Sequence, residues 1–424
     1  MTTTMANLPV VLVDDILSRV PMTSLRAIRL TCKTWNRLSK NQIIGKKAAT
    51  KNQFLGFMLI DFTICSMRFD LRGISNNDDD DDFIDQSVKE VSELYEYAIS
   101  QIFHCDGLLL CVFNDTSSKT LMVCNMYLGQ TRRVKARQLF DRFSKSGVYA
   151  FGYDDSEENR NHKILRNETN GGGYEIYDFG SDSWRVIDVA PDGDTNFVAV
   201  PRTLVAEVTA VTPLPLGHKD RLNAYFFATE EYDETLVVEG ETLYSRESRL
   251  MLLCFDFTSE TFGQLLTLPF HSLGDLVVVD SSVESWALSC VGDEKLAVLF
   301  QHYKTIKIWV STEIEPNAVS WDEFLEVDLT MFGGVPDDFR AGSFFVDEEK
   351  EVAVVFDQET KKDRDQTAYI IGKGGYFKSV NFGDDPPSYS LPLVCSSYVP
   401  SLVQVDKQAK GKINKQGKRK ERDY

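Results

Sequence analysis

The sequence has no long hydrophobic run, and this absence bears on where the chain works. No stretch approaches the ~20 consecutive apolar residues that a membrane helix needs. The first residues have no basic lead-in, and Asp14 and Asp15 interrupt their only apolar run, which is unlike a secretory signal. We therefore expect no membrane partner, and a chain that works in the nucleus, the cytoplasm or both.

Residue types that hold metals are also sparse or poorly spaced. The chain has five histidines, and none lies at ligand spacing from a cysteine or carboxylate. Its eight cysteines form no C-x-x-C pair and no disulfide framework, which indicates buried free thiols in a reducing compartment. We expect neither a metal nor a cofactor.

Two further patterns contain catalytic residue types but lack the geometry for catalysis. His104, Cys105 and Asp106 are residue types of a thiol protease, yet neighbours on a strand point to opposite faces of the sheet. The glycine-rich stretches 171–173 and 372–375 lack the Lys-Ser/Thr ending and the following helix of a phosphate-binding loop. Hairpin tips explain both stretches better. We expect no catalytic residues.

Charge divides the chain into three parts. Residues 1–50 and 407–424 each contain eight Lys and Arg against two Asp and Glu, a net +6. Because the whole chain carries −18, residues 51–406 carry −30. This middle part repels nucleic acid and favours a target with basic patches. The basic tail, 406–424, lacks a hydrophobic pattern and should be disordered, as either a nuclear-import signal or a solubilising end.

The first forty residues contain apolar residues at helical spacing. Val13, Leu17 and Val20 recur at i, i+4 and i+7, beside a second apolar row. Pro21 ends this helix, and two shorter helical runs follow. A unit of about forty residues is near the lower limit for burying its own core. A partner protein, or the rest of this chain, must therefore cover part of this apolar surface.

The same residues resemble the F-box motif. The Leu8-Pro9 pair, a second proline and a Cys-Lys-x-Trp run that ends at Trp35 occur in order at that family's spacing. F-box modules dock onto a small acidic Skp-type adaptor, which links them to a cullin and a ubiquitin-conjugating machinery. The resemblance assigns nine residues to the adaptor-binding surface: Leu8, Pro9, Ile16, Leu17, Val20, Pro21, Leu25, Leu30 and Trp35. Leu30 and Trp35 can equally fill the module's own core, and an ordinary helical cap on the next domain is the alternative for the whole segment.

Beyond residue 50 the periodicity changes to mostly two residues, with short apolar segments between turn residues. This pattern predicts a mainly β fold. Strands are expected at 108–113, 121–126, 148–153, 173–179, 184–189, 250–257, 276–280, 296–302, 307–311, 344–346 and 352–357. Helical stretches are expected only at 87–97 and around 321–325.

A weak internal repeat indicates how the strands are arranged. A strand end, a turn built on Asn or Asp and the start of the next strand recur around Asn125, Asp178, Asp256 and Asp357. A period of about fifty residues with four strands per unit is typical of kelch-type propellers, in which stacked neighbours cover both faces of each blade. We expect about six irregular blades, with five or seven left open and residues 191–249 breaking the pattern. A pair of β-sandwiches is the alternative.

Six short motifs occur in order along the β region: His104–Cys111, Tyr127–Arg132, Phe151–Asp154, Ile308–Val310, Val319–Trp321 and Tyr398–Leu402. Together they resemble the plant F-box-associated interaction domain of type 1. The chain then divides into an F-box at 1–50, a connecting segment at 51–99 with an acidic loop at 76–82, a propeller-like domain at 100–405 and a disordered basic tail at 406–424.

The two resemblances imply a substrate-recognition subunit of a Skp-cullin-F-box ubiquitin ligase. Such a subunit is not an enzyme: it holds a target protein near a charged ubiquitin carrier and raises the effective concentration of a target lysine. Its expected partners are an acidic Skp-type adaptor, through it a cullin, and an unknown target with basic patches. The alternatives are a propeller enzyme or lectin-like sugar-binding protein with a helical cap, and an F-box protein that acts outside ligases as a regulatory tether.

Overall fold

The computed structural model describes most of the chain between residues 53 and 405. The described residues are 53–60, 62–71, 85–91, 94, 97–113, 120–135, 147–154, 160–168, 173–188, 213–216, 221–238, 241–270, 284–292, 295–357, 366–383, 393–395 and 400–405. The nine candidate adaptor-binding residues, the acidic loop 76–82 and the basic tail 406–424 all lie outside them. No helix in the described residues is long and apolar enough to cross a membrane.

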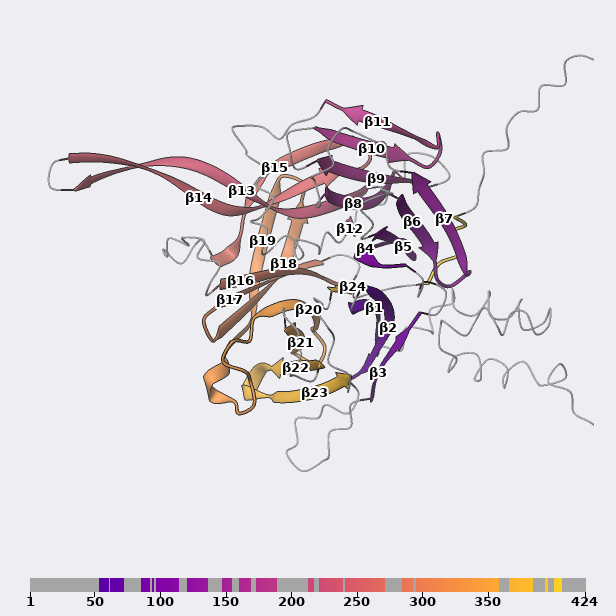
Figure 1. Ribbon diagram of the computed structural model, residues 1–424. Coiled ribbons are helices and arrows are strands. Elements are labelled where there is room, and N and C mark those ends of the chain that lie inside the picture. The colour runs from indigo at the N-terminus through magenta and orange to yellow at the C-terminus, as the bar shows by residue number, and fades with distance from the viewer. Residues whose placement is uncertain are drawn as a thin grey trace, which may run out of the picture.

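Within these ranges the strands form six antiparallel four-stranded sheets (Figure 1). The first sheet contains β24 (Leu393–Cys395), β1 (Gln53–Ile60), β2 (Thr63–Asp70) and β3 (Asp85–Glu90). The second contains β4 (Ile99–Cys105), β5 (Leu108–Phe113), β6 (Thr120–Asn125) and β7 (Gln130–Lys135). The third contains β8 (Gly147–Asp154), β9 (Asn161–Glu168), β10 (Tyr174–Asp178) and β11 (Ser183–Ile187).

The other three sheets follow the same order. The fourth contains β12 (Pro213–Leu216), β13 (Arg221–Val238), β14 (Glu241–Asp256) and β15 (Thr261–Thr267). The fifth contains β16 (Glu284–Val291), β17 (Lys295–His302), β18 (Thr305–Glu315) and β19 (Ala318–Asp328). The sixth contains β20 (Ala341–Asp347), β21 (Val352–Asp357), β22 (Gln366–Gly372) and β23 (Phe377–Gly383). Two 3-10 turns, η4 (Leu329–Met331) and η5 (Lys373–Gly375), lie between strands.

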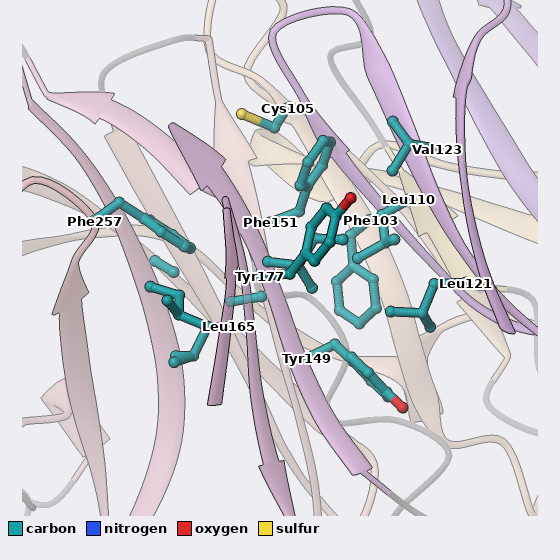
Figure 2. Packing of buried hydrophobic residues seen from close by; sticks show 14 of the residues in the cluster. Phe103, Cys105, Leu110, Leu121, Val123, Tyr149, Phe151, Leu165, Tyr177 and Phe257 are labelled. Carbon is teal, nitrogen blue, oxygen red and sulfur yellow. The ribbon is translucent and has the colours of Figure 1, made fainter. Parts of the chain in front are cut away.

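The sheets are the blades of a propeller, which confirms the predicted mainly β fold and the expected six blades. Each buried hydrophobic cluster joins neighbouring sheets, and Figure 2 shows one in which Phe103 and Phe151 come from the second and third sheets and Phe257 from the turn that follows β14. Middle strands such as β5 and β21 are buried on both faces, which is why they read as continuous apolar runs. Outer strands such as β7 alternate and are polar.

The ring is closed by its C-terminal strand, and this corrects the predicted boundary at residue 100. β24 pairs with β1, with Cys395 opposite Phe57 and Leu393 opposite Leu59. The segment 51–99 is therefore not only a connection, because it supplies three strands of a blade. The blade was missed since its inner strand comes from the far end of the chain, a pairing that local periodicity cannot reveal.

Three local expectations were also wrong. Residues 87–90, expected to be helical, belong to β3, and the expected helical turn around 321–325 lies in β19. Backbone pairing to β2 and β18 decides both, against the local spacing. Residues 191–249 do not break the blade pattern where they are described, since they contain β12, β13 and part of β14. The strand expected at 276–280 lies outside the described residues.

The cysteines fit the prediction of buried free thiols. Six are described as free and buried: Cys65, Cys105, Cys111, Cys124, Cys254 and Cys290. Burial raises the pKa of Cys65 and of Cys254 to about 12, so both stay protonated at neutral pH.

Candidate functional site

The strand order distinguishes two faces of the propeller. β1 is the second strand of its sheet and begins at Gln53, so residues 1–52 join the face from which second strands start. β24 runs antiparallel to β1, so the chain leaves the ring at this face as well. We call it the entry face; it carries the turns that follow the first and third strands, such as Asp106–Gly107. The opposite, distal face carries Phe62, Tyr303 and Met331.

Three turns that follow third strands on the entry face share one design, and they belong to the repeat found in the sequence. Asn125, Asp178 and Asp256 end the third strands β6, β10 and β14. In each case the Oδ1 atom accepts a hydrogen bond from the backbone N–H three residues later, at 2.8, 2.8 and 3.2 Å. The side chain that ends each strand thus helps to hold the turn that follows it. Asp357, the fourth predicted member, is not equivalent, because it ends a second strand, β21.

The residue four positions after each turn residue has left-handed backbone. Gly129, Asp182 and Glu260 have φ values of 65°, 54° and 57°. Glycine adopts this conformation without strain, and aspartate does so more readily than most residues. At the last two positions the strained residue carries a carboxylate, which reaches the preceding blade.

These carboxylates connect blades. Asp182 lies 2.6 Å from the guanidinium of Arg132 on β7, and Glu260 contacts the guanidinium of Arg185 on β11. Glu260 also lies 2.8 Å from the ammonium of the buried Lys163 on β9. The turns at Asp178 and Asp256 therefore tie their own blades to the outer or second strand of the blade before.

Asn125 has a further role, because it fixes the segment after β24. Its Nδ2 donates hydrogen bonds to the carbonyls of Ser401 and Val403, at 3.1 and 2.7 Å. Val405 N–H donates to the Gln130 side chain at 3.2 Å. The end of the propeller is thereby held against the second blade as well as in the first, so two blades share the closure of the ring.

The His104, Cys105 and Asp106 trio has a structural arrangement. Gly107 N–H donates to Nε2 of His104 at 3.3 Å, and burial lowers the pKa of His104 to about 4. Burial also raises the pKa of the Cys105 thiol. A neutral imidazole beside a protonated thiol is not an activated nucleophile. Asp106 instead lies 2.6 Å from the guanidinium of Arg160.

The distal face exposes large apolar side chains. Met331 is 79% exposed, Tyr303 62% and Phe62 42%. Tyr303 belongs to a line of rings that begins at the buried Phe270, which stacks on Phe300 with centroids 4.5 Å apart. His302 continues the line and meets Tyr303 edge-on at 4.7 Å. This surface can contact a protein partner, and residues 1–52 join on the other side of the ring.

The described residues contain no group of three His, Cys, Asp or Glu side chains that could hold a metal ion. The sequence predicted the turn residues, but Arg132, Arg185 and Lys163, the basic residues that pair with Asp182 and Glu260, were missed. The available signal was the repeat itself, since the carboxylates at 182 and 260 follow Asp178 and Asp256 at the same distance. The repeat could not show which strand of the neighbouring blade supplies the basic partner of each carboxylate.

Known protein families match both the N-terminal segment and the propeller of this chain. Residues 5–47 match the F-box domain family, and residues 55–204 and 222–405 match the F-box associated beta propeller domain. F-box protein At1g11810 of Arabidopsis thaliana is 49% identical over 426 residues, which cover 100% of both chains. F-box/kelch-repeat protein At3g13680 of the same plant is 47% identical over 446 residues, which cover 99% of both.

A propeller that follows an F-box defines the class: an F-box protein with a β-propeller domain. This chain belongs to the family of F-box proteins that carry an F-box associated beta propeller domain. Among solved structures, a putative 6-phosphogluconolactonase from Bacteroides uniformis aligns with 82% of this chain and 100% of its own, at 10% identity and a TM-score of 0.37. A likeness at that level supports no argument about function.

Proposed function

We propose that this chain is the substrate-recognition subunit of a Skp-cullin-F-box ubiquitin ligase. The observation that carries the proposal is the joining of an F-box at residues 5–47 to a six-bladed propeller through its entry face. F-box domains generally bind Skp-type adaptors. A module attached at the entry face leaves the distal face available to a target.

The nine candidate residues of the F-box fall into two groups. Leu8, Pro9, Ile16, Leu17, Val20, Pro21 and Leu25 form the adaptor contact in this proposal, and Leu30 and Trp35 contribute to it or to the core beneath it. The net +6 of residues 1–50 favours an acidic adaptor, because complementary charge speeds encounter and fixes orientation. A cullin joins through the adaptor.

The chain itself performs no chemistry in this proposal. It binds a target, brings a lysine of that target near the charged ubiquitin carrier and raises its effective concentration. We place this activity in the nucleus, the cytoplasm or both. The basic tail, net +6 over 407–424, is the proposed import signal.

Affinity capture with two forms of the chain tests the proposal. The full chain and a form lacking residues 1–52 are expressed at equal levels. The amount of each captured protein is measured, and so is the half-life of that protein in the cell. The shortened form should retain a set of proteins that the full chain binds only transiently, and these proteins should become longer-lived when the shortened form competes with the full chain. Equal capture by both forms, with no change in any half-life, would rule out the receptor role.

A further inference from the structure

One part of the propeller extends far beyond its blade. In the fourth sheet β13 and β14 pair continuously from Asn223 opposite Asp256 to Val238 opposite Glu241. Their outer neighbours are short: the pairing of β12 extends only to Ala224 of β13, and the pairing of β15 extends only to Met251 of β14. We call residues 229–250 the hairpin arm, which Figure 1 shows projecting away from the blades.

The arm leaves the propeller on the face opposite the one at which β1 begins. β13 and β1 are both second strands of their sheets, so both run from the entry face to the distal face. The arm follows Ala228, so it leaves the propeller on the distal side. At about 3.3 Å per residue, the ten residues from Thr229 to Val238 extend it by about 30 Å. It lies on the side proposed for the target.

Each strand of the arm has one open edge among the described residues. Residues 229–238 of β13 pair with β14 alone, and no described strand pairs with their other side. An isolated two-stranded ribbon is marginally stable in water, and an open edge presents a row of backbone donors and acceptors. An extended peptide segment can add to such an edge as a third strand.

The two strands of the arm differ in the charge of their sequences. On β13 the arm has Glu230, Glu231, Asp233 and Glu234 and no basic residue. On β14, residues 241–250 balance Glu241 and Glu247 against two arginines. A second copy of the same edge would bring like charges opposite one another and is disfavoured. A lysine- or arginine-rich strand would meet opposite charges instead.

We propose that the β13 edge of the hairpin arm binds an extended basic segment of the target by strand addition. The inference rests on the proposed function, since it names the class of target that the propeller would deliver. Backbone hydrogen bonds to residues 229–238 supply the pairing, and the four acidic residues select the basic sequence. It goes beyond the general acidity of the domain, because it assigns recognition to one strand.

The test uses the full chain and a fluorescent twelve-residue probe peptide of alternating lysine and valine. Anisotropy titrations compare the wild type with Glu231→Lys/Asp233→Lys on β13 and with a matched variant, Glu241→Lys/Glu247→Lys, on β14. Both variants change the net charge equally. We expect the β13 variant to weaken binding at least tenfold and the β14 variant to change it less than threefold. A third variant, in which Asn-Gly replaces residues 230–248, should lose binding.

Two further peptides separate strand addition from simple attraction. The same lysine–valine peptide with alternate backbone nitrogens methylated cannot form the ladder and should bind at least tenfold more weakly. A peptide of alternating glutamate and valine should not bind. Equal weakening by both charge variants, binding without the arm, or equal binding of the methylated peptide would each overturn the proposal. Adaptor binding by the arm-deleted variant is measured in parallel: its retention shows that the variant folds, whereas failure of the wild type to bind adaptor contradicts the receptor role instead.

Discussion

The guanidinium of Arg132, on the outer strand of the second blade, lies 2.6 Å from the carboxylate of Asp182, in a turn of the third blade. Asp182 is held there by left-handed backbone and by a hydrogen bond from the Tyr177 hydroxyl. The same relationship joins Arg185 to Glu260 one blade further on. A turn that is local in sequence thus becomes a joint between blades.

A double-mutant cycle measures the strength of this joint. We combine Arg132→Ala with Asp182→Asn, because asparagine tolerates the left-handed backbone and removes only the charge. The coupling energy should stay below about 1 kcal/mol, since Asp182 is largely exposed and solvent screens the pair. Hydrogen bonds from Tyr177 and Arg132 lower the pKa of Asp182, so its contribution is complete above the ordinary pKa of 3.8 and is lost as pH falls through the lower folded value. Urea unfolding at several pH values checks both statements, and a coupling that grows below pH 3.8 would contradict them.

Asn125 should contribute more to stability than the Arg132–Asp182 pair, because it is fully buried and joins the ring closure to the second blade. Asn125→Asp keeps the acceptor for Leu128 N–H but points an oxygen at the carbonyls of Ser401 and Val403. We expect the free energy of unfolding to fall by about 3 kcal/mol and the backbone amide of Val405 to exchange its hydrogen faster. Asp256→Asn, which keeps the equivalent turn acceptor, should cost less than about 1 kcal/mol. If both variants lose the same stability, Asn125 acts only in its turn.

Gly152 is required by the packing between the third and fourth blades. A Cβ at this position would lie 2.2 Å from the ring of Phe257, which is fully buried. Gly152→Ala should therefore destabilise the protein by about 1–3 kcal/mol through overpacking. Gly333→Ala is the control, because a Cβ there would meet nothing within 4 Å. Thermal unfolding of the two variants compares them, and equal midpoints would show that the ring of Phe257 moves freely aside.

His104 should make stability depend on pH. Burial lowers its folded pKa to about 4 from 6.5, so the unfolded chain binds the proton first as pH falls. Stability from this group is complete above pH 6.5 and declines towards pH 4, at up to about 1.4 kcal/mol per pH unit. His104→Gln can still accept from Gly107 N–H and should remove this slope. Urea unfolding between pH 7 and pH 5 tests it; parallel curves for the two proteins would contradict the lowered pKa.

The blades that were predicted best are those whose strands form consecutive hairpins. β5 and β21 were predicted over their observed bounds, and β8, β10 and β17 nearly so, because buried apolar runs between turns are a local signal. The fourth blade was obscured by its hairpin arm. Beyond Ala228, β13 is a strand because its backbone pairs with β14. Its sequence there is rich in charged residues and has no hydrophobic alternation that would predict a strand.

The candidate site divides in the same way. Asn125, Asp178 and Asp256 were recognisable because each acts on its own turn within three residues. Arg132 and Arg185 were not, because their partners lie in the next blade. The nine adaptor-binding residues remain a prediction from the F-box motif, since they lie outside the described part of the chain.

Binding of the purified full chain to a Skp-type adaptor tests the central claim most directly. Calorimetry compares the wild type with Leu17→Asp/Pro21→Ala in the F-box, and with Gly333→Ala in the propeller as a matched folded control. The receptor role predicts a one-to-one complex for the wild type and for the control, and a loss of affinity of at least a hundredfold for the F-box variant. Equal adaptor binding by the wild type and the F-box variant, or no binding by the wild type, would contradict it.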